Sequence, residues 1–344
     1  MKNEGRVTGG VFPRSVAANM HADPAVLYLS QADTRSLLNW PEVIACLARA
    51  YEHDDDPRAA PPKVVARRDG MWLRALTAIS ATGGCMGAKI IAKGRPRAAD
   101  HFIALWDRDT ARLACLLDGK NVTAMRTAGT SAVAVDRIAG EGELRLAVLG
   151  SGREATTHVN AIAAVRPVRS LAVYSPTPAN RESFARKFSG ELAVECVAVN
   201  SARAAVEEAD LVIAAARSHD ETAILEGAWL RPGAMVVSIG STVPEQREVD
   251  PEVVARADAI VADAPDEVGR ETGDMIAARE AGVSFDHKLV PLADVVRGRL
   301  PVRQDRDNIV LFKSVGSGLQ DIAVSELCYA KARAGGIGIA LPIG

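Results

Sequence analysis

The stretch Leu144-Arg-Leu-Ala-Val-Leu-Gly-Ser-Gly-Arg-Glu-Ala155 decides the fold of the second half of the chain. Its apolar residues 146–149 predict a buried parallel strand, and the residues after it predict a helix through Val165. The order of strand, G-x-G-x-x-A and helix is the fingerprint of dinucleotide binding. Gly150 permits the tight turn, Gly152 lets a pyrophosphate approach the backbone, and Ala155 permits close packing of the helix on the strand. The alternative is a glycine turn that only joins a strand to a helix.

This stretch supplies the first group of expected cofactor-binding residues. They are Gly150, Ser151, Gly152, Arg153, Glu154 and Ala155.

Length and composition limit the classes of protein to consider. With 344 residues the chain is expected to form two domains. Its formal net charge of −2 gives no electrostatic reason to expect a nucleic-acid partner. No run of about 18 apolar residues predicts a membrane span, and the N-terminal residues lack the apolar core of a signal peptide. We therefore expect a cytoplasmic protein with no membrane partner. The cysteines are scattered without C-x-x-C spacing, so we expect reduced thiols and no metal site.

The first half of the chain predicts an α+β domain with mostly antiparallel strands. Residues 1–25 lack periodicity and are expected to form a flexible arm. Residues 26–29 are expected to form a strand, Ser30 or Asp33 to cap a helix, and Trp40 to begin a second helix. Further strands are expected at 63–67, 71–78 and 86–93, and a hairpin at 102–107 and 111–118. A helix from Thr123 to about Gly140 then carries the chain into its second half.

The second half alternates strands and helices as a doubly wound parallel sheet does. After the strand at 146–149, strands are expected at 171–174, 194–199, 211–215, 235–239, 259–261 and 309–312. Residues 318–333 predict a final amphipathic helix that packs back against the first domain. The predicted fold class is α/β, a Rossmann doubly wound domain plus an α+β domain. The predicted divisions are 26–137 with about 318–344 for the α+β domain, and 138–317 for the Rossmann domain.

The end of the second strand of a dinucleotide fold indicates which nucleotide is bound. When the adenosine ribose carries no phosphate, this strand usually ends in Asp or Glu. Here Ser175 and Thr177 follow the strand, and Asn180 and Arg181 come next. Hydroxyl, amide and guanidinium groups can bind a 2′-phosphate that a carboxylate would repel. We predict a preference for NADP(H) over NAD(H). The alternative is that Ser175 and Thr177 only cap the next helix.

Two basic residues of the first half are candidates for chemistry. Lys89 lies in the apolar strand Gly87–Ile91, where an unpaired ammonium is costly, so it needs a carboxylate, a ligand or an exit to solvent. Arg126 begins a segment of small residues that lets a ligand approach the backbone. Lys63 and Arg74 are weaker candidates, because a basic residue in such a position is more often a solvated surface charge.

Motifs along residues 26–341 resemble the ornithine cyclodeaminase/mu-crystallin family. They are Gly87–Ile90, Asp118–Thr130, the loop at Gly150, Ile239–Glu248 and Lys313–Gly316. The resemblance implies a Rossmann domain plus a substrate domain that also dimerises, so a homodimer is expected. It implies that Arg126 pairs with the substrate α-carboxylate. Lys89 would contact that carboxylate or the reacting C=N or C=O group.

The same resemblance implies the remaining contacts. Lys63 stands where the family usually has a second carboxylate-binding arginine, and a lysine keeps the charge but loses the bidentate fork. Together with Arg74, it completes the expected substrate-binding residues. The further cofactor-binding residues are Thr127, Ser175, Thr177, Asn180, Arg181, Ala215, Gly240, Asp263, Ser314, Val315 and Gly316.

One departure from the family bears on the reaction. Ornithine cyclodeaminase has its acid/base aspartate at the position that resembles Thr242, and ammonia loss from ornithine is hard to explain without that carboxylate. Imine reduction needs only a carboxylate clamp, a hydride from the nicotinamide and a proton from Lys89 or water. We therefore predict NAD(P)H-dependent reduction of a small α-imino acid, or the reverse amino-acid dehydrogenase reaction. Arg74 and Lys63 favour a substrate with a second carboxylate, such as iminosuccinate.

Two alternatives remain. One is a cyclodeaminase-type lyase that recycles its bound NAD without net turnover of the cofactor. The other is a mu-crystallin-like protein that binds NADPH and a small ligand but reduces no imino acid.

Overall fold

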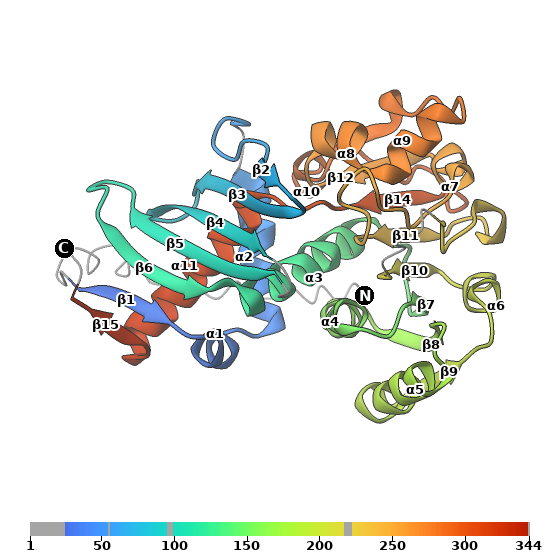
Figure 1. The fold of residues 1–344 in the computed structure, drawn as a ribbon. Helices are drawn as coiled ribbons and strands as arrows, with labels where there is room; N and C mark the ends of the chain where they lie inside the picture. The colour runs from blue at the N-terminus through green and yellow to red at the C-terminus, as the bar shows by residue number, and fades with distance from the viewer. Residues whose placement is uncertain (1–24, 54–55, 95–98, 217–221, 343–344) are drawn as a thin grey trace, which may run out of the picture.

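Two β-sheets with their own helices lie side by side in the computed structural model, and a long helix, α3, joins them (Figure 1). The structure describes residues 25–53, 56–94, 99–216 and 222–342. The expected N-terminal arm lies outside this range apart from Ala25. Within the described ranges, no helix is long and apolar enough to cross a membrane.

The first sheet has the order β15-β1-β6-β5-β4-β3-β2, and all its pairs are antiparallel except β1 with β6. This agrees with the mostly antiparallel arrangement predicted. Every strand expected here is found, and the three-residue β15, which pairs with β1, was not expected. The strands are β1 Val26–Leu29, β2 Val64–Arg68, β3 Met71–Ile79, β4 Cys85–Lys93, β5 Asp100–Asp107, β6 Leu113–Asp118 and β15 Ile339–Leu341.

Four helices accompany the first sheet: α1 Gln31–Leu37, α2 Trp40–His53, α3 Gly119–Ile138 and α11 Gly318–Gly335. Both candidate caps of α1 take part, because Ser30 and Asp33 form a capping box. Helix α3 begins four residues before the expected Thr123, since Asp118 ends β6 and also caps the helix by accepting a hydrogen bond from the Lys120 N–H.

Helix α11 differs from its predicted amphipathic character. It packs against β3, β4 and β5 on one side and against α2 and α3 on the other, so most of its residues are buried, polar ones included. A helix enclosed in this way has no continuous solvent face, and only its last turn, at residues 334–335, is exposed. The polar residues of α11 that resemble a solvated face in the sequence therefore include interior groups.

The second sheet is entirely parallel, with the order β13-β12-β14-β11-β10-β7-β8-β9. The three-residue β13 was not expected. The strands are β7 Leu144–Leu149, β8 Val168–Tyr174, β9 Glu195–Ala198, β10 Leu211–Ala214, β11 Met235–Ser238, β12 Ala259–Ala262, β13 Leu289–Pro291 and β14 Val310–Lys313. The helices between them are α4 Arg153–Ala163, α5 Pro178–Leu192, α6 Ala202–Val206, α7 Pro251–Arg256, α8 Pro265–Glu271, α9 Gly273–Glu280 and α10 Leu292–Val296.

The strand order of the second sheet reverses between β7 and β10. From β7 the chain winds outward through β8 and β9, then returns to place β10 on the other side of β7. In open parallel sheets, ligands bind outside the carboxyl ends of the strands at such a switch point. Gly150 follows β7 and Ala215 follows β10, so both lie at this position.

Candidate functional site

The backbone at the switch point suits a dinucleotide. Gly150 has φ +116°, and a Cβ there would lie 2.8 Å from the carbonyl oxygen of Ala215, so no other residue fits without strain. Gly152 begins α4 without a capping side chain, and a Cβ there would meet nothing within 4 Å. The first-turn N–H groups of α4 thus have no capping side chain at Gly152, and there is room beside this glycine for a pyrophosphate to bind them. Ala155 is fully buried, as close packing of helix on strand requires.

The residues after β8 form one connected group beside this loop. Ser151 Oγ donates to Ser175 Oγ at 2.9 Å, and Arg181 Nη1 donates to the Ser175 carbonyl at 3.0 Å. Thr177 is the N-cap of α5, yet its side chain makes no capping hydrogen bond. The alternative that Ser175 and Thr177 serve only as helix caps thus finds no support. Asn180 lies in the first turn of α5.

A second group lies at the carboxyl ends of β12 and β14. The Asp263 carboxylate accepts hydrogen bonds from Ser314 Oγ at 2.6 Å, from the Val315 N–H at 3.0 Å and from the Gly316 N–H at 2.8 Å. Four of the expected cofactor residues are therefore brought together. Gly316 has φ +81°, and a Cβ there would lie 2.3 Å from Arg126 Nη1. The arginine thus packs directly against this edge of the second sheet.

The centre of the site is a buried carboxylate between two cations. Lys89 Nζ lies 2.7 Å from each oxygen of the Asp321 carboxylate, and Arg126 Nε lies 2.9 Å from its Oδ1. Lys89 and Asp321 are completely buried and Arg126 is nearly so. A carboxylate, that of Asp321, is therefore the partner of the Lys89 ammonium, which was one of the three possibilities expected from the sequence. Asp321 was not anticipated, because it comes from the enclosed helix α11.

Burial and neighbouring charge alter the acid–base behaviour of this centre. Burial lowers the pKa of Lys89 to about 7, and Arg126 adds to the effect while Asp321 opposes it. Burial and the same two cations lower the pKa of His101 to about 4, so this histidine is neutral at pH 7. His101 Nδ1 lies 3.2 Å from Thr123 Oγ1. Lys89 is therefore the better proton donor of the two near neutral pH.

The two weaker candidates have different surroundings. Lys63 is ion-paired with Glu267 and lies 3.1 Å from Glu271, so the structure brings it to α8 and not to Asp321. Arg74 lies over the ring of Trp72, 5.1 Å from its centroid, and its buried Nε has no hydrogen-bond partner among the described residues. Burial is the main cause that lowers the pKa of Arg74.

Arg74 nevertheless lies on the same sheet face as Lys89. On β3 and β4, Arg74 is opposite Ile91 and Leu76 is opposite Lys89. Residues two apart on a strand share a face, so Arg74 and Lys89 are diagonal neighbours.

A buried ionic cluster that was missed in the sequence supports Gly240. Lys313 Nζ donates to Ser238 Oγ at 2.7 Å and to Asp274 Oδ2 at 2.6 Å. Glu248 Oε2 accepts from Ser238 Oγ and from the Gly240 N–H, both at 2.7 Å. Burial raises the pKa of Glu248 to about 7, and Asp274 adds to this rise while Lys313 opposes it. Lys313 ends an apolar strand as Lys89 lies within one, so the same argument from burial could have identified it.

The remaining expected residues have local contacts. Thr127 Oγ1 donates to the Thr123 carbonyl within α3 at 2.8 Å. In the first turn of α4, Arg153 Nη2 lies 3.7 Å from Glu154 Oε1. The Thr242 N–H donates to Gln246 Oε1 at 3.4 Å in the loop after β11.

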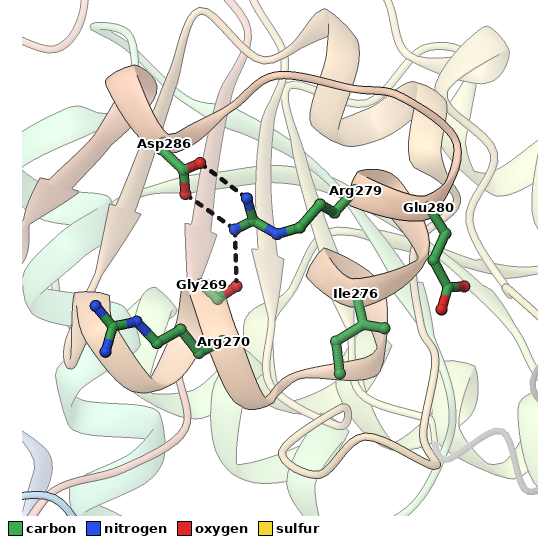
Figure 2. A pocket seen from close by; sticks show the side chains of 6 residues that line it. All are labelled: Gly269, Arg270, Ile276, Arg279, Glu280 and Asp286. Carbon is green, nitrogen blue, oxygen red and sulfur yellow. Dashed lines mark hydrogen bonds and ion pairs between the residues drawn. The ribbon is translucent and has the colours of Figure 1, made fainter.

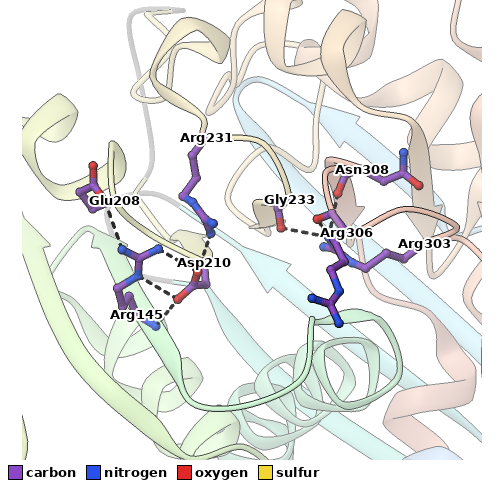
Figure 3. Close-up of polar contacts among 8 residues, drawn as sticks. All are labelled: Arg145, Glu208, Asp210, Arg231, Gly233, Arg303, Arg306 and Asn308. Atoms are coloured by element: carbon purple, nitrogen blue, oxygen red, sulfur yellow. Dashed lines mark hydrogen bonds and ion pairs between the residues drawn. The ribbon is translucent and has the colours of Figure 1, made fainter.

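Two surface hollows lie away from these groups. One, of about 720 Å³, has Arg279 already paired with Asp286 at 2.9 Å (Figure 2). The other, of about 870 Å³, lies at the amino-terminal ends of β7 and β10, where Arg145 and Arg231 both bind Asp210 (Figure 3). Neither hollow is lined by an expected site residue.

Comparisons with known proteins identify a family and a fold. Residues 44–336 match the model of the ornithine cyclodeaminase/mu-crystallin family. A putative dehydrogenase of Rhizobium meliloti is 32% identical over 71% of this chain and 74% of its own length. Mouse ketimine reductase mu-crystallin is 26% identical over 84% of this chain and 90% of its own. The structure of Thermococcus litoralis Δ1-pyrroline-2-carboxylate reductase, in complex with NADH and L-proline, superimposes with a TM-score of 0.85 at 28% identity, covering 92% of this chain and all of that one.

Proposed function

The chain belongs to the ornithine cyclodeaminase/mu-crystallin family, and on that premise we propose that it is an NAD(P)H-dependent oxidoreductase. It reduces a small α-imino acid to an amino acid, or runs the reverse dehydrogenase reaction. The observation that carries the proposal is the pair of cations, Lys89 and Arg126, on one buried carboxylate against Gly316. The names of the mouse and Thermococcus relatives, both imine reductases, support the same reaction.

Charge explains why this centre takes a carboxylate. Two cations and the single carboxylate of Asp321 leave one positive charge, which the substrate α-carboxylate neutralises. Arg126 offers the planar fork that matches a carboxylate. When bound, the nicotinamide supplies the hydride for the imine carbon. Lys89 holds a proton at Nζ that the imine nitrogen requires, and its lowered pKa lets it release that proton near neutral pH.

The cofactor is held by the groups at the carboxyl edge of the second sheet. The loop from Gly150 and the first turn of α4 bind the pyrophosphate, with Ala215 and Gly240 beside them. Asp263, residues 314–316 and Thr127 are assigned to the nicotinamide side. Ser175, Thr177, Asn180 and Arg181 bind the 2′-phosphate, which makes NADP(H) the preferred cofactor. The guanidinium of Arg181 is already oriented toward Ser175, which supports this assignment.

Arg74 is proposed to select substrates with a second acid group. Lys63 already has two carboxylate partners, whereas the buried Nε of Arg74 has none among the described residues. Because Arg74 is a diagonal neighbour of Lys89, it can reach the side chain of a substrate whose α-carboxylate lies at Arg126. Imino dicarboxylic acids are therefore expected among the best substrates.

We also propose a homodimer formed through the outer face of the first sheet. Helix α11 covers the inner face, while large apolar residues on the outer face are exposed: Val64 at 72%, Leu73 at 49% and Ile339 at 59%. The strand register places all three on this same face. An apolar patch of this kind marks an interaction site, and in a homodimer the same patch can meet its own copy.

The proposed domain division, 26–137 with 318–344 for one domain and 138–317 for the other, follows the two sheets.

A substrate panel tests the proposed reaction. The protein is mixed with NADPH or NADH and with cyclic imino acids, or with 2-oxo acids plus ammonia or methylamine, and cofactor absorbance is followed. Stoichiometric oxidation of the cofactor with formation of the amino acid is expected. Product formation from ornithine without net cofactor oxidation would instead indicate the lyase reaction, and cofactor binding without any reduction would indicate a binding protein.

A further inference from the structure

Gln320 on α11 joins the two halves of the site through one buried amide. Its Nε2 donates to Asp263 Oδ2 at 2.8 Å and to the Tyr51 hydroxyl at 2.8 Å, while its Oε1 accepts from Arg126 Nη1 at 2.8 Å. The side chain is completely buried. Its partners come from α2, from α3 and from the end of β12, so the amide connects three separate elements.

Chemistry fixes the orientation of this amide. An ionised carboxylate only accepts hydrogen bonds and a guanidinium only donates them, so the NH₂ group must face Asp263 and the oxygen must face Arg126. Both N–H groups of Gln320 are used, one by Asp263 and one by Tyr51. A buried polar group with all donors satisfied is rigid and costly to disturb.

Asp263 also organises the carboxyl ends of β12 and β14, at residues 263 and 314–316, which we call the cofactor edge. The same carboxylate binds Ser314 Oγ and the N–H groups of Val315 and Gly316. One side of Gln320 is therefore tied to the segment assigned to the nicotinamide, and its other side is tied to the arginine assigned to the substrate carboxylate. A shift of either group changes the hydrogen bonds available to the other.

We propose that Gln320 is a positioning residue that sets Arg126 in register with the cofactor edge and couples the binding of cofactor and substrate carboxylate. This inference rests on the proposed function, since it takes the roles of Arg126 and of residues 314–316 from it. A cofactor that orders the Asp263 edge also orders Gln320 and hence Arg126. A carboxylate ligand then binds more tightly when the cofactor is present, and linkage makes the effect reciprocal.

Binding measurements test the coupling without turnover. The Kd of L-proline is measured by calorimetry with and without saturating NADPH in the full-length protein, because an amino acid cannot accept the hydride of the reduced cofactor. We expect the cofactor to tighten L-proline binding by about 5- to 150-fold in the unsubstituted protein, the usual range for coupled sites. In Gln320→Leu we expect this ratio to fall to within about twofold of unity. The NADPH affinity measured without L-proline stays within about threefold of the unsubstituted value, because Asp263 keeps its three other donors.

Further variants separate positioning from a structural role. Gln320→Glu keeps the shape but places a carboxylate beside Asp263, so the ratio also collapses. Tyr51→Phe removes one acceptor and serves if the leucine variant does not fold. Ser325→Ala is the matched control, because Ser325 is buried on the same helix and its hydroxyl has no partner among the described residues. The control keeps the ratio.

Two results would overturn the coupling proposal. One is a ratio of unity in the unsubstituted protein. The other is a ratio that Gln320→Leu and Gln320→Glu leave unchanged even though they lower the melting temperature. Failure of the proposed function is a separate outcome, since it requires that the unsubstituted protein reduce none of the imino acids in the substrate panel.

Discussion

Replacing Lys89 by methionine tests the proton-donor role assigned to it. Methionine has a similar length and no charge, so it fills the buried space while removing the ammonium. Asp321 keeps Arg126 as an ion-pair partner at 2.9 Å, so the variant retains a paired carboxylate and is expected to fold. Arg126 also remains available to the substrate carboxylate.

The expected loss follows from the role. A positioned general acid contributes about 10²- to 10⁴-fold to the rate, so kcat of imine reduction should fall by that factor. This corresponds to about 3–5 kcal/mol in the barrier. KM should rise as well, because the centre loses the net positive charge that attracts the carboxylate, but by less than kcat falls.

The pH dependence gives the sign of the effect. Imine reduction needs the protonated form of Lys89, whose pKa is about 7, so kcat should decline as pH rises above about 7. The reverse oxidation of the amino acid needs the neutral amine, so its rate should instead rise through the same pH. Both profiles are measured from about pH 5.5 to about pH 9.5 by cofactor absorbance.

Glu248 supplies the control for these profiles, because its pKa is also raised to about 7 in the cluster with Lys313, Asp274 and Ser238. Glu248→Gln should keep the decline of kcat above about pH 7, and Lys89→Met should lose this decline. A Lys89→Met enzyme that keeps the decline above about pH 7 and loses less than about threefold in kcat would refute the role of Lys89.

Three further predictions address stability, cofactor and assembly. Asp321→Asn leaves two buried cations without their counter-ion, so the free energy of unfolding at pH 6 should fall by about 3–5 kcal/mol in a urea titration; an unchanged midpoint would contradict the buried pairing. Ser175→Asp places a carboxylate where the 2′-phosphate is expected, so kcat/KM should fall at least about tenfold for NADPH and little for NADH; a large NADH preference in the unsubstituted enzyme would contradict the assignment. Val64→Asp with Leu73→Asp should convert the dimer to a monomer in sedimentation experiments, and a dimer that survives both changes does not use this face.

The sequence predicted those parts of the site that form within one short, contiguous stretch of the chain. The Gly150 turn is a contiguous strand, glycine loop and helix, so its fold follows from a short stretch. Lys89 could be singled out because an ammonium in an apolar strand needs a partner. Its partner could not be identified, since Asp321 lies 232 residues away in the chain.

Tertiary packing decided what sequence periodicity could not. Asp321 and Gln320 resemble polar positions of an amphipathic helix, and they are buried only because α11 lies between a sheet and two helices. The sequence shows no partner for the charge of Lys63, but α8, which belongs to the second sheet, brings Glu267 and Glu271 to it. Strands β13 and β15 have three residues each, too few for an alternating pattern.

The carboxylate clamp is the central claim, and Arg126→Ala tests it most directly. Reduction of the best imino acid and the Kd of NADPH are measured on the same preparation. We predict that turnover is almost abolished while NADPH still binds with nearly unchanged affinity, because Arg126 belongs to the substrate side of the site. Undiminished turnover in Arg126→Ala would contradict the account.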